Sequence, residues 1–561
     1  CNHKNTLKTR CLECKEEVCC ECFANSVRSK STCPICGKTM IISDVIDSCK
    51  RGQLENSQSL LSLLTPPHPS RISNGEFSRG TEMRGGRSII SGMSDVSVFA
   101  DESTYVADTG SALFEHPDSP EYVTFTKEKG WDFKIIQTAT LEKMVEVMTR
   151  KNSEDPYFAE CLVFGYPTCT TKEELISVLL KRFNPRRPEG MSWEEFMRTI
   201  LTPVRMKIMG FMRSWVKWRF TDFDEIDMRC TLETLVRMYE SFKPKMARYM
   251  KDFIDKQDRH LHEPIPEFEQ GEEVKHLKDM EGLPTLFTYS TKDVAKQITL
   301  MQFDKFRRIT VDELLSQAWM KKDAKTQTPN IVAMTQLTNT LSYNVQNVIL
   351  GIEKLKYRIF AMEYFIKVAE ELRQLHNFDG FKAIVAALDS SAIYRLKQTR
   401  EGLSDDAKEK LKEFNDIVNY EGNFKKLREI TAVCEPPCIP FVGSTLGDLV
   451  FTKENEKSEG DSRGLINFFR VRTYGSMLRE LVLKQEATFP FSQSMTLISL
   501  IKALPAIDDD DKLFEMSQKL EESRPNNEFT KEEKKVIAHS KDRAEDIWKK
   551  YNSSWKKLLK E

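Results

Sequence analysis

The sequence predicts a mainly α-helical protein, in which a helical domain precedes a larger all-α domain with a protruding helical hairpin, and a small metal-stabilised module precedes both. Three observations support this prediction. The 561 residues exceed what one hydrophobic core holds, so several domains are expected. Apolar residues recur at three- and four-residue spacing over much of the chain beyond residue 123. The first 49 residues hold nine of the 14 cysteines, which is typical of a metal-binding module.

Charge and hydropathy argue against two classes of function. Lys and Arg number 84 against 85 for Asp and Glu, so no overall basic field points to nucleic acid. No apolar run reaches the roughly 18 to 20 residues that span a bilayer, and no signal-peptide pattern opens the chain. We therefore expect a cytoplasmic protein whose partners are chosen by local surfaces.

Residues 1–45 carry eight candidate metal ligands in four pairs. Thiolate and imidazole donors suit zinc, which takes four of them in a tetrahedron, so eight donors predict a module stabilised by two zinc ions. The eight are Cys1, His3, Cys11, Cys14, Cys19, Cys22, Cys33 and Cys36, with Cys20 as an alternative to Cys19. The second half of the pattern resembles a RING finger, whereas the spacing from His3 to Cys22 is more similar to a B-box. A scaffold module and a ubiquitin ligase both fit these ligands.

The following segments differ in composition. Residues 46–122 are rich in Ser, Gly and Pro and lack a periodic apolar face, which predicts a disordered linker. Residues 123–245 predict a helical domain, with Thr140 and Thr171 as N-caps of two amphipathic helices. Residues 246–284 are strongly charged and predict a solvated connector.

Several blocks of sequence occur in the order found in Ras-family guanine nucleotide exchange factors of the son-of-sevenless type. These blocks are residues 293–300, 314–330, 376–380, 388–396, 436–454 and 465–468. Residues 285–525 therefore resemble the catalytic domain of that family, and residues 123–245 resemble its Ras exchanger motif domain. The resemblance implies a protein that opens a Ras-superfamily small GTPase, of the Ras, Rap or Ral type, without covalent chemistry. GDP, GTP and Mg would belong to the partner GTPase.

Two apolar stripes predict the helical hairpin of the larger domain. The first stripe is Leu446, Leu449 and Val450, and the second is Leu465, Ile466, Phe469, Met477, Leu478 and Leu481. A polar break at residues 455–462 separates them, so two helices joined by a short acidic turn are expected. Val450 and Glu454 are four residues apart and share one helical face.

The resemblance also implies roles for individual residues. Val450 would crowd the Mg position of the GTPase, and Glu454 would present a carboxylate near its phosphate-binding loop. Phe441 would line a pocket that grips an aromatic residue of the GTPase, and Tyr394 would lie in the contact surface. Five further contact positions depart from the family's usual residues and leave the identity of the GTPase open. They are Lys382, Thr335, Gln336, Asp389 and Phe424.

Two alternatives stay open at this point. Residues 526–561 predict an amphipathic helix, which either packs back on the larger domain or makes a peripheral membrane contact through its lysines. The alternative to an exchange factor is a zinc-finger scaffold or ubiquitin ligase that binds a small GTPase without catalysing exchange.

Overall fold

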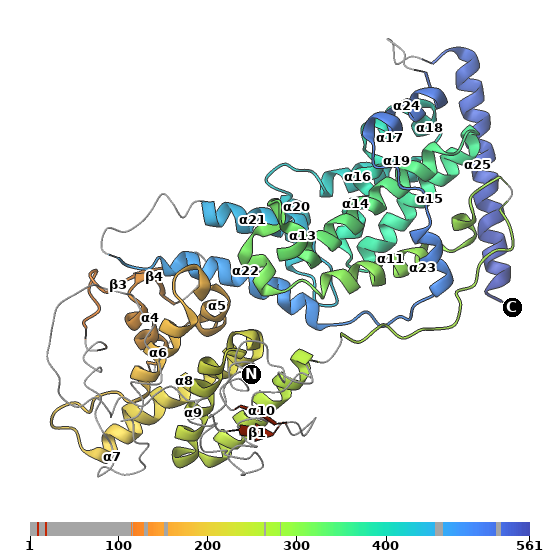
Figure 1. Ribbon diagram of the computed structural model, residues 1–561. Coiled ribbons are helices and arrows are strands. Elements are labelled where there is room, and N and C mark those ends of the chain that lie inside the picture. Colours follow the sequence, from red (N-terminus) through yellow and green to blue (C-terminus); the bar gives the residue numbers. More distant parts are fainter. Residues whose placement is uncertain are drawn as a thin grey trace. The chain divides into compact units, whose positions relative to one another are not determined.

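The computed structural model describes most of the chain beyond residue 113. The described residues are Phe114 and residues 116–127, 133–150, 155–262, 265–280, 282–454, 464–522 and 529–560, together with the backbone of two short strands near the N-terminus. The side chains of Ser241, Leu261, His262 and Glu454 lie outside this description. The fold is nearly all helical, as the sequence predicts, and divides into two compact units (Figure 1). Unit 1 comprises residues 1–264 and 461–475, and unit 2 comprises residues 265–460 and 476–561.

The predicted zinc module is described only by its two strands. Strands β1 (Lys8–Arg10) and β2 (Glu17–Cys19) pair antiparallel, with Lys8 opposite Cys19. Apart from the backbone of Cys19, the eight predicted ligands lie outside the described residues, and so does most of the predicted linker. Two zinc ions and a disordered linker therefore remain predictions.

Beyond the β1–β2 pair, the described part of unit 1 consists of a second two-stranded sheet and a group of helices. Strands β3 and β4 pair antiparallel, and α8 packs against α5 and α6, while α9 packs against α10. Threonine caps begin two helices as expected: the hydroxyl of Thr140 accepts a hydrogen bond from the Lys143 amide, and that of Thr171 from the Glu174 amide. The elements are β3 (Val123–Thr126), β4 (Ile135–Ala139), α4 (Leu141–Met148), α5 (Phe158–Gly165), α6 (Lys172–Phe183), α7 (Trp193–Phe196), a π-helical turn (Met197–Leu201), α8 (Thr202–Trp218), α9 (Ile226–Phe242) and α10 (Pro244–His262).

Two boundaries of unit 1 differ from the sequence prediction. The last part of the predicted linker is ordered, because Asp118 accepts hydrogen bonds from Arg150, which follows α4, and pairs with Lys143 of α4. The first part of the predicted connector is the helix α10, which buries Ala247, Met250 and the apolar part of its amphipathic face. The many charged residues of α10 make its sequence look polar throughout. The apolar residues of the buried face still recur at three- and four-residue spacing, and this spacing is what predicts an amphipathic helix.

Unit 2 is built around α15, which packs against α11, α16 and α25 (Figure 1). Its core is a single cluster of buried apolar side chains drawn from most of these helices. The helices are α11 (Thr291–Phe306), α12 (Val311–Ser316), α13 (Ala324–Gln327), α14 (Pro329–Leu350), α15 (Leu355–Gln374), α16 (Phe378–Leu388), α17 (Ser391–Tyr394), α18 (Lys397–Glu401), α19 (Asp405–Ile417), α20 (Lys425–Ala432), α21 (Val442–Glu454), α22 (Phe468–Glu486), α23 (Met495–Lys502), α24 (Asp510–Leu520) and α25 (Lys531–Leu558). The first eight residues of α22 belong to unit 1 and the remainder to unit 2.

The two predicted hairpin helices are present as α21 and α22. Leu446 and Leu449 of the first stripe and Leu478 and Leu481 of the second are buried. The second stripe is wrong at one position, since Phe469 is exposed and Phe468 is buried instead. The Phe468 ring stacks on the Phe158 ring at a centroid distance of 4.4 Å, which turns its neighbour outward.

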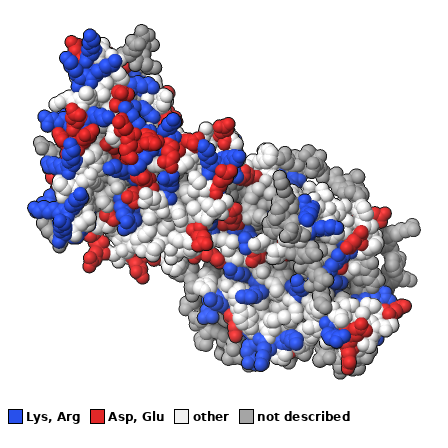
Figure 2. All heavy atoms as spheres, turned by 180° about the vertical axis from the view of Figure 1, so that it is seen from behind, with Lys and Arg blue, Asp and Glu red and all other residues white. Residues whose placement is uncertain are grey.

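The C-terminal helix α25 packs back on unit 2, the first of the two alternatives for this segment. Its buried face carries Trp548, Tyr551 and Trp555, and Trp548 lies 4.5 Å from Phe360 of α15 between ring centroids. Among the described helices, none is long and apolar enough to cross a membrane. Acidic and basic side chains are interspersed over the described surface that Figure 2 shows, in keeping with the balanced composition.

Candidate functional site

A proline-rich turn leads into α21 and is fixed to the start of α16. The amide of Ile439 donates to the His376 carbonyl at 2.9 Å, and the amide of Phe378 donates to the Ile439 carbonyl at 2.8 Å. These two bonds join two of the sequence blocks that carry the family resemblance. The turn therefore holds the start of α21 in a fixed position next to the start of α16 in unit 2.

A buried carboxylate lies where α21 begins. Asp379 is 2% exposed, and its Oδ1 accepts a hydrogen bond from the amide of Val442, the first residue of α21, at 3.4 Å. Its Oδ2 accepts from Gln302 Nε2 at 2.9 Å and from the hydroxyl of Thr338. Burial raises the pKa of Asp379 to about 6, although the bonds from Thr338 and Val442 act in the opposite direction.

Further along α21, polar contacts hold the helix to its neighbours in unit 2. Arg428 of α20 pairs with Asp448 through both of its terminal nitrogens, with 2.8 Å between Nη2 and Oδ1. Asn423 Nδ2 also donates to Asp448, at 3.1 Å. Gln317, which follows α12, donates to the Leu449 carbonyl at 2.8 Å. The helix is thus attached to unit 2 at its start and again near its middle.

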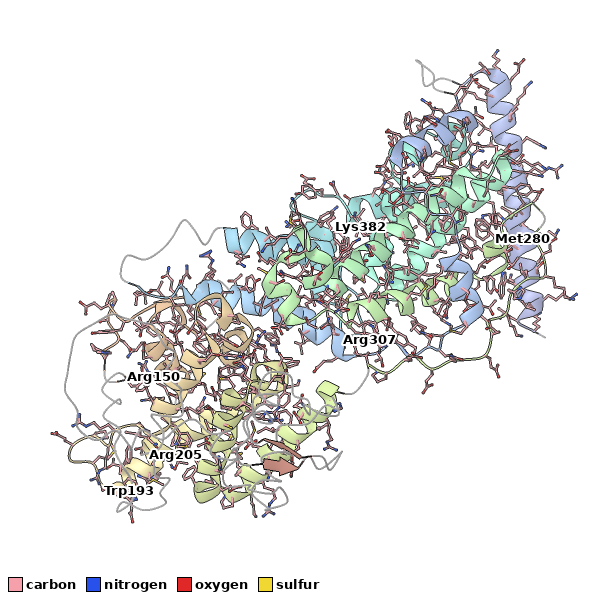
Figure 3. All side chains as sticks on the ribbon, viewed as in Figure 1. Arg150, Trp193, Arg205, Met280, Arg307 and Lys382 are labelled. Carbon is pink, nitrogen blue, oxygen red and sulfur yellow. The ribbon has the colours of Figure 1, made fainter. Side chains whose placement is uncertain are left out.

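Three of the predicted contact residues form one group beside α21. The ring of Phe441 lies 5.2 Å from the ring of Phe424 in an edge-to-face arrangement, and Lys382 Nζ lies 5.1 Å from the Phe441 centroid. Burial lowers the pKa of Lys382, whose position in unit 2 is labelled in Figure 3. A Cβ added at Gly443 would come within 2.7 Å of the Phe441 ring, so this glycine lets the aromatic side chain lie against α21.

A cavity of about 260 Å³ opens between α20, α21 and the part of α22 in unit 2. Its walls combine apolar side chains such as Met477 and Leu481 with the charged side chains of Asp448, Glu480 and Lys484. Phe441 also lines this cavity, so the aromatic group and the Arg428–Asp448 pair share one surface.

The other predicted contact residues lie on α14, directly after α16 and at the end of α17. Tyr394 is 50% exposed, and its ring lies against two cations, with Lys397 Nζ at 4.2 Å and Arg400 at 4.8 Å from the centroid. Burial lowers the pKa of Arg400, and the charge of the exposed Asp389 opposes this shift. Thr335 and Gln336 are exposed on α14.

The two residues to which the resemblance assigns exchange lie on the last turns of α21. Val450 is half-buried, and Glu454 is the final residue of the helix. The side chain of Glu454 lies outside the described residues, so its role stays a prediction. Sequence reasoning missed Phe451, which is 67% exposed beside Val450. The sequence did contain a signal for it: Phe451 does not share the helical spacing of the buried Leu446 and Leu449, so an exposed aromatic side chain could have been predicted there.

Sequence reasoning also missed Arg428, Asp448 and the role of Asp379. Their pairings join residues 20 to 63 positions apart, and no local pattern marks them. In the described part of the chain, no cluster of three His, Cys, Asp or Glu side chains is placed to hold a metal ion.

Comparison with known proteins agrees with this geometry. Residues 293–472 match the model of the RasGEF domain, and residues 135–254 match the model of the RasGEF N-terminal motif. The chain therefore carries one segment similar to each of these two domains. The α21–α22 segment falls mostly within the first match.

Individual relatives carry names of the same class. The chain is 28% identical over 352 residues to Ras guanine nucleotide exchange factor A of Dictyostelium discoideum, covering 60% of this chain and 56% of the relative. It is 31% identical over 329 residues to Ras-specific guanine nucleotide-releasing factor 2 of Mus musculus, covering 57% and 27%. It is 24% identical over 433 residues to Protein son of sevenless of Drosophila melanogaster, covering 70% and 26%. The chain thus spans from about a quarter to little more than half of these relatives.

Proposed function

We propose that this protein is a guanine nucleotide exchange factor for a Ras-family small GTPase. The observation that carries the proposal is the anchored helix α21, which lies inside the matched RasGEF domain and displays Val450 and the exposed Phe451. Exchange of this kind makes and breaks no covalent bond. The protein binds its partner and lowers the partner's affinity for GDP.

The last turns of α21 supply the groups that displace the nucleotide. Mg and the phosphates are the strongest charges in a GTPase nucleotide site, so excluding the ion removes much of the binding free energy. Val450 excludes the ion with an apolar group, and Glu454 engages the donors that otherwise hold the phosphates. A GTPase that binds its nucleotide at picomolar Kd requires about 16 kcal/mol of compensating contact. The aromatic group around Phe441 contributes part of this contact.

Thermodynamic linkage sets the direction of the reaction. The factor by which the exchange factor weakens the nucleotide equals the factor by which the nucleotide weakens the exchange factor. Incoming GTP therefore releases the exchange factor from the GTPase. The cellular excess of GTP over GDP, and not a property of this chain, determines which nucleotide is loaded.

The test is release of a fluorescent GDP analogue from a panel of Ras, Rap, Ral and Rho-type GTPases. We expect acceleration on at least one member, strongly reduced by Glu454→Ala and by Val450→Asp. Lys453→Ala is the matched control, because Lys453 is an exposed residue of the same helical turn. Binding to a GTPase without acceleration, by a folded protein, would favour the scaffold alternative instead.

Partner choice is proposed to depend on Lys382. This lysine lies beside the Phe441 ring and is half-buried. A partially desolvated ammonium favours a carboxylate or carbonyl from the partner at this point. Lys382→Leu is expected to change the order of preference within the GTPase panel, while Lys425→Leu on the exposed start of α20 leaves the order unchanged.

We further propose that residues 1–45 hold two structural zinc ions. The support for this is the spacing of the eight Cys and His ligands, since segments this short usually need metal to fold. Elemental analysis of the purified chain is expected to give two zinc ions per molecule, and one fewer after Cys33→Ala together with Cys36→Ala. Retention of the full zinc content in that variant would overturn the ligand assignment.

A further inference from the structure

The last part of α25 and the residues directly after it present lysines to solvent. Residues 549–560 hold five lysines and no acidic residue, and all five lysine side chains are exposed. At 3.6 residues per turn, these lysines fall within about one third of the helix circumference, opposite the buried Trp548, Tyr551 and Trp555. This α25 lysine face consists of Lys549, Lys550, Lys556, Lys557 and Lys560.

Little negative charge opposes the α25 lysine face among the described residues. Lys549 lies 3.5 Å from Asp546, but both side chains are more than half exposed, so this pair is weak. Residues 271–280 pass the end of α25, where Lys275 Nζ donates to the Leu558 carbonyl at 3.0 Å, and they carry two lysines and three acids. One of these acids, Glu273, bonds to Ser494 of α23 at 2.8 Å. The face therefore keeps most of its positive charge.

Stabilisation of the helix end explains only part of this arrangement. Cations are favourable near a helix C-terminus, but the effect falls off within the last turn. Lys556 and Lys557 lie in that turn, whereas Lys549 and Lys550 lie about two turns earlier. Packing of α25 on α15 depends on the buried face around Trp548 and not on the lysines. The earlier lysines therefore indicate an interaction outside the folded chain.

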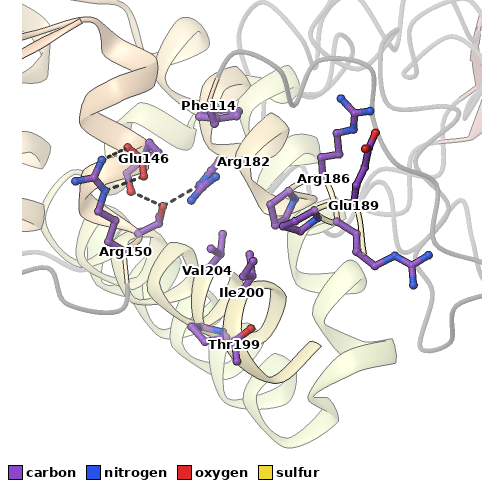
Figure 4. A pocket seen from close by; sticks show the side chains of 14 residues that line it. Phe114, Glu146, Arg150, Arg182, Arg186, Glu189, Thr199, Ile200 and Val204 are labelled. Atoms are coloured by element: carbon purple, nitrogen blue, oxygen red, sulfur yellow. Dashed lines mark hydrogen bonds and ion pairs between the residues drawn. The ribbon is translucent and has the colours of Figure 1, made fainter. Parts of the chain in front are cut away.

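Basic side chains also line a cavity of about 650 Å³ in unit 1, but they differ from the α25 lysine face (Figure 4). The Arg150 guanidinium bonds to Glu146 at 2.6 Å and to Asp118 at 2.6 Å, so its charge is compensated. The side chains of Arg182 and Arg186 point apart and do not meet at one place. The lysines of α25, in contrast, share one exposed face of one helix.

We propose that the α25 lysine face binds the surface of an anionic lipid bilayer. Lysines held close to such a surface are attracted by its acidic headgroups. Leu559, which is 69% exposed, lies at the edge of the face and supplies an apolar side chain that enters the headgroup region. Because Trp548 and Trp555 stay buried in unit 2, α25 binds the bilayer without leaving the folded protein.

The composition of the face favours a lipid surface over a nucleic acid. Single-stranded nucleic acids stack their bases on exposed aromatic rings, whereas the two tryptophans and the tyrosine of this part of α25 are buried. Arginine is the residue that pairs with single phosphates through its planar fork, and residues 549–560 contain only lysine as a basic residue. Lysines spread over a helix surface suit a partner that is itself an extended charged surface.

The α25 lysine face lies away from the proposed exchange site. Figure 1 shows the C-terminal end of α25 and the helix α21 on opposite sides of unit 2. A bilayer bound at α25 therefore leaves α21 accessible to a GTPase. The proposal does not depend on exchange activity, and GDP release in solution should be unchanged when the lysines are substituted.

Sedimentation of the full chain with vesicles tests the proposal. The probes are phosphatidylcholine vesicles with and without phosphatidylserine. Binding is expected only with phosphatidylserine and should weaken as the salt concentration rises. Each lysine near an anionic surface contributes about a factor of five, so joint substitution Lys556→Gln, Lys557→Gln and Lys560→Gln should weaken binding about a hundredfold. Leu559→Gln should weaken it about tenfold.

The matched control is the joint substitution Lys531→Gln, Lys534→Gln and Lys535→Gln. It removes three exposed lysines from the first turns of the same helix, where Glu532 and Glu533 lie among them, and should leave vesicle binding nearly unchanged. Three outcomes would overturn the proposal. They are equal binding to vesicles without phosphatidylserine, equal losses in the two triple variants, and binding of a DNA oligonucleotide through the lysine face without binding of any vesicle.

Discussion

The guanidinium of Arg428 on α20 and the carboxylate of Asp448 on α21 form a bidentate salt bridge, with 2.8 Å between Nη2 and Oδ1. Asp448 lies two residues before Val450 and one turn before Thr452, whose hydroxyl bonds to the Asp448 carbonyl at 2.7 Å. The bridge therefore fixes the part of α21 from which the exposed Phe451 projects. Arg428 and Asp448 are positioning residues in the proposed exchange reaction.

Breaking this bridge is expected to slow exchange more than it destabilises the fold. Arg428→Met should reduce the rate of GDP release about tenfold, which corresponds to about 1.4 kcal/mol of lost transition-state stabilisation. Faster hydrogen exchange of the α21 amides would show that the helix has loosened. Asp448→Asn should give a similar loss, and the double variant should lose little more than either single change.

Lys426→Met provides the matched control for that prediction. Lys426 lies on the same helix and pairs with Asp416, but both side chains are more than half exposed. Exposed pairs contribute about 0 to 1 kcal/mol, so neither the exchange rate nor the α21 amides should change. Equal effects of Lys426→Met and Arg428→Met would contradict the positioning role.

The buried Asp379 predicts a pH dependence of stability. Its pKa in the folded protein is about 6, above the ordinary aspartate pKa of 3.8 that applies to the unfolded chain. The folded state therefore binds this proton more tightly. Its contribution to stability is fully present below pH 3.8 and is lost as the pH rises to about 6.

Comparison with Asp379→Asn isolates this effect. The free energy of unfolding of the wild type, relative to the variant, should fall by about 2 to 3 kcal/mol between these two pH values. Urea unfolding at a series of pH values measures it. A difference that stays constant over this interval would show that the carboxyl of Asp379 titrates normally.

Neutralising the buried carboxylate of Glu521 is expected to lower the stability of the folded protein strongly. Its carboxylate accepts hydrogen bonds from Arg358 at 3.1 Å, from the Thr399 hydroxyl at 2.7 Å and from the Gln398 amide at 2.8 Å, all within unit 2. Glu521→Gln leaves the Arg358 charge buried without its counter-ion, which should cost about 3 kcal/mol. Thermal unfolding provides the measurement.

The next residue supplies the control for Glu521. Glu522 is exposed, and Glu522→Gln makes the same chemical change one position along the chain. Its effect should stay within about 0.5 kcal/mol. If the two variants unfold at the same temperature, the buried ion pair does not stabilise unit 2.

The contact between α25 and α15 predicts a further stability effect. Trp548 is 8% exposed, packs on Phe360 and has Lys367 Nζ 3.8 Å above its ring. Trp548→Ala should lower the free energy of unfolding by about 3 to 5 kcal/mol. Val536→Ala on the exposed part of the same helix should change it by less than about 0.5 kcal/mol. An equal loss in both variants would mean that helix propensity, and not packing, stabilises α25.

Local signals in the sequence predicted the helices well but not the contacts between them. Thr140 and Thr171 were recognisable as caps, because a cap bonds within three residues of itself. The stripe of Leu446 and Leu449 likewise predicted a buried face on α21. The charge density of α10 misled the prediction for residues 246–284, since a narrow apolar face carried the signal there.

The candidate site was predictable only in part. Resemblance brought Phe441, Phe424 and Lys382 to attention, and the structure brings these three together. The polar contacts of α21 to Asp379 and Arg428 join distant positions, and polar residue types alone do not reveal their partners.

The buried tryptophans of α25 have a practical consequence for work with shortened forms of this chain. A version that stops before Lys531 would leave the α15 surface around Phe360 in contact with water. Large exposed apolar surfaces promote self-association. Such a fragment would be expected to precipitate or form oligomers. A low rate of nucleotide exchange measured with it would then reflect aggregation of the fragment, and not the ability of α21 to act on a GTPase.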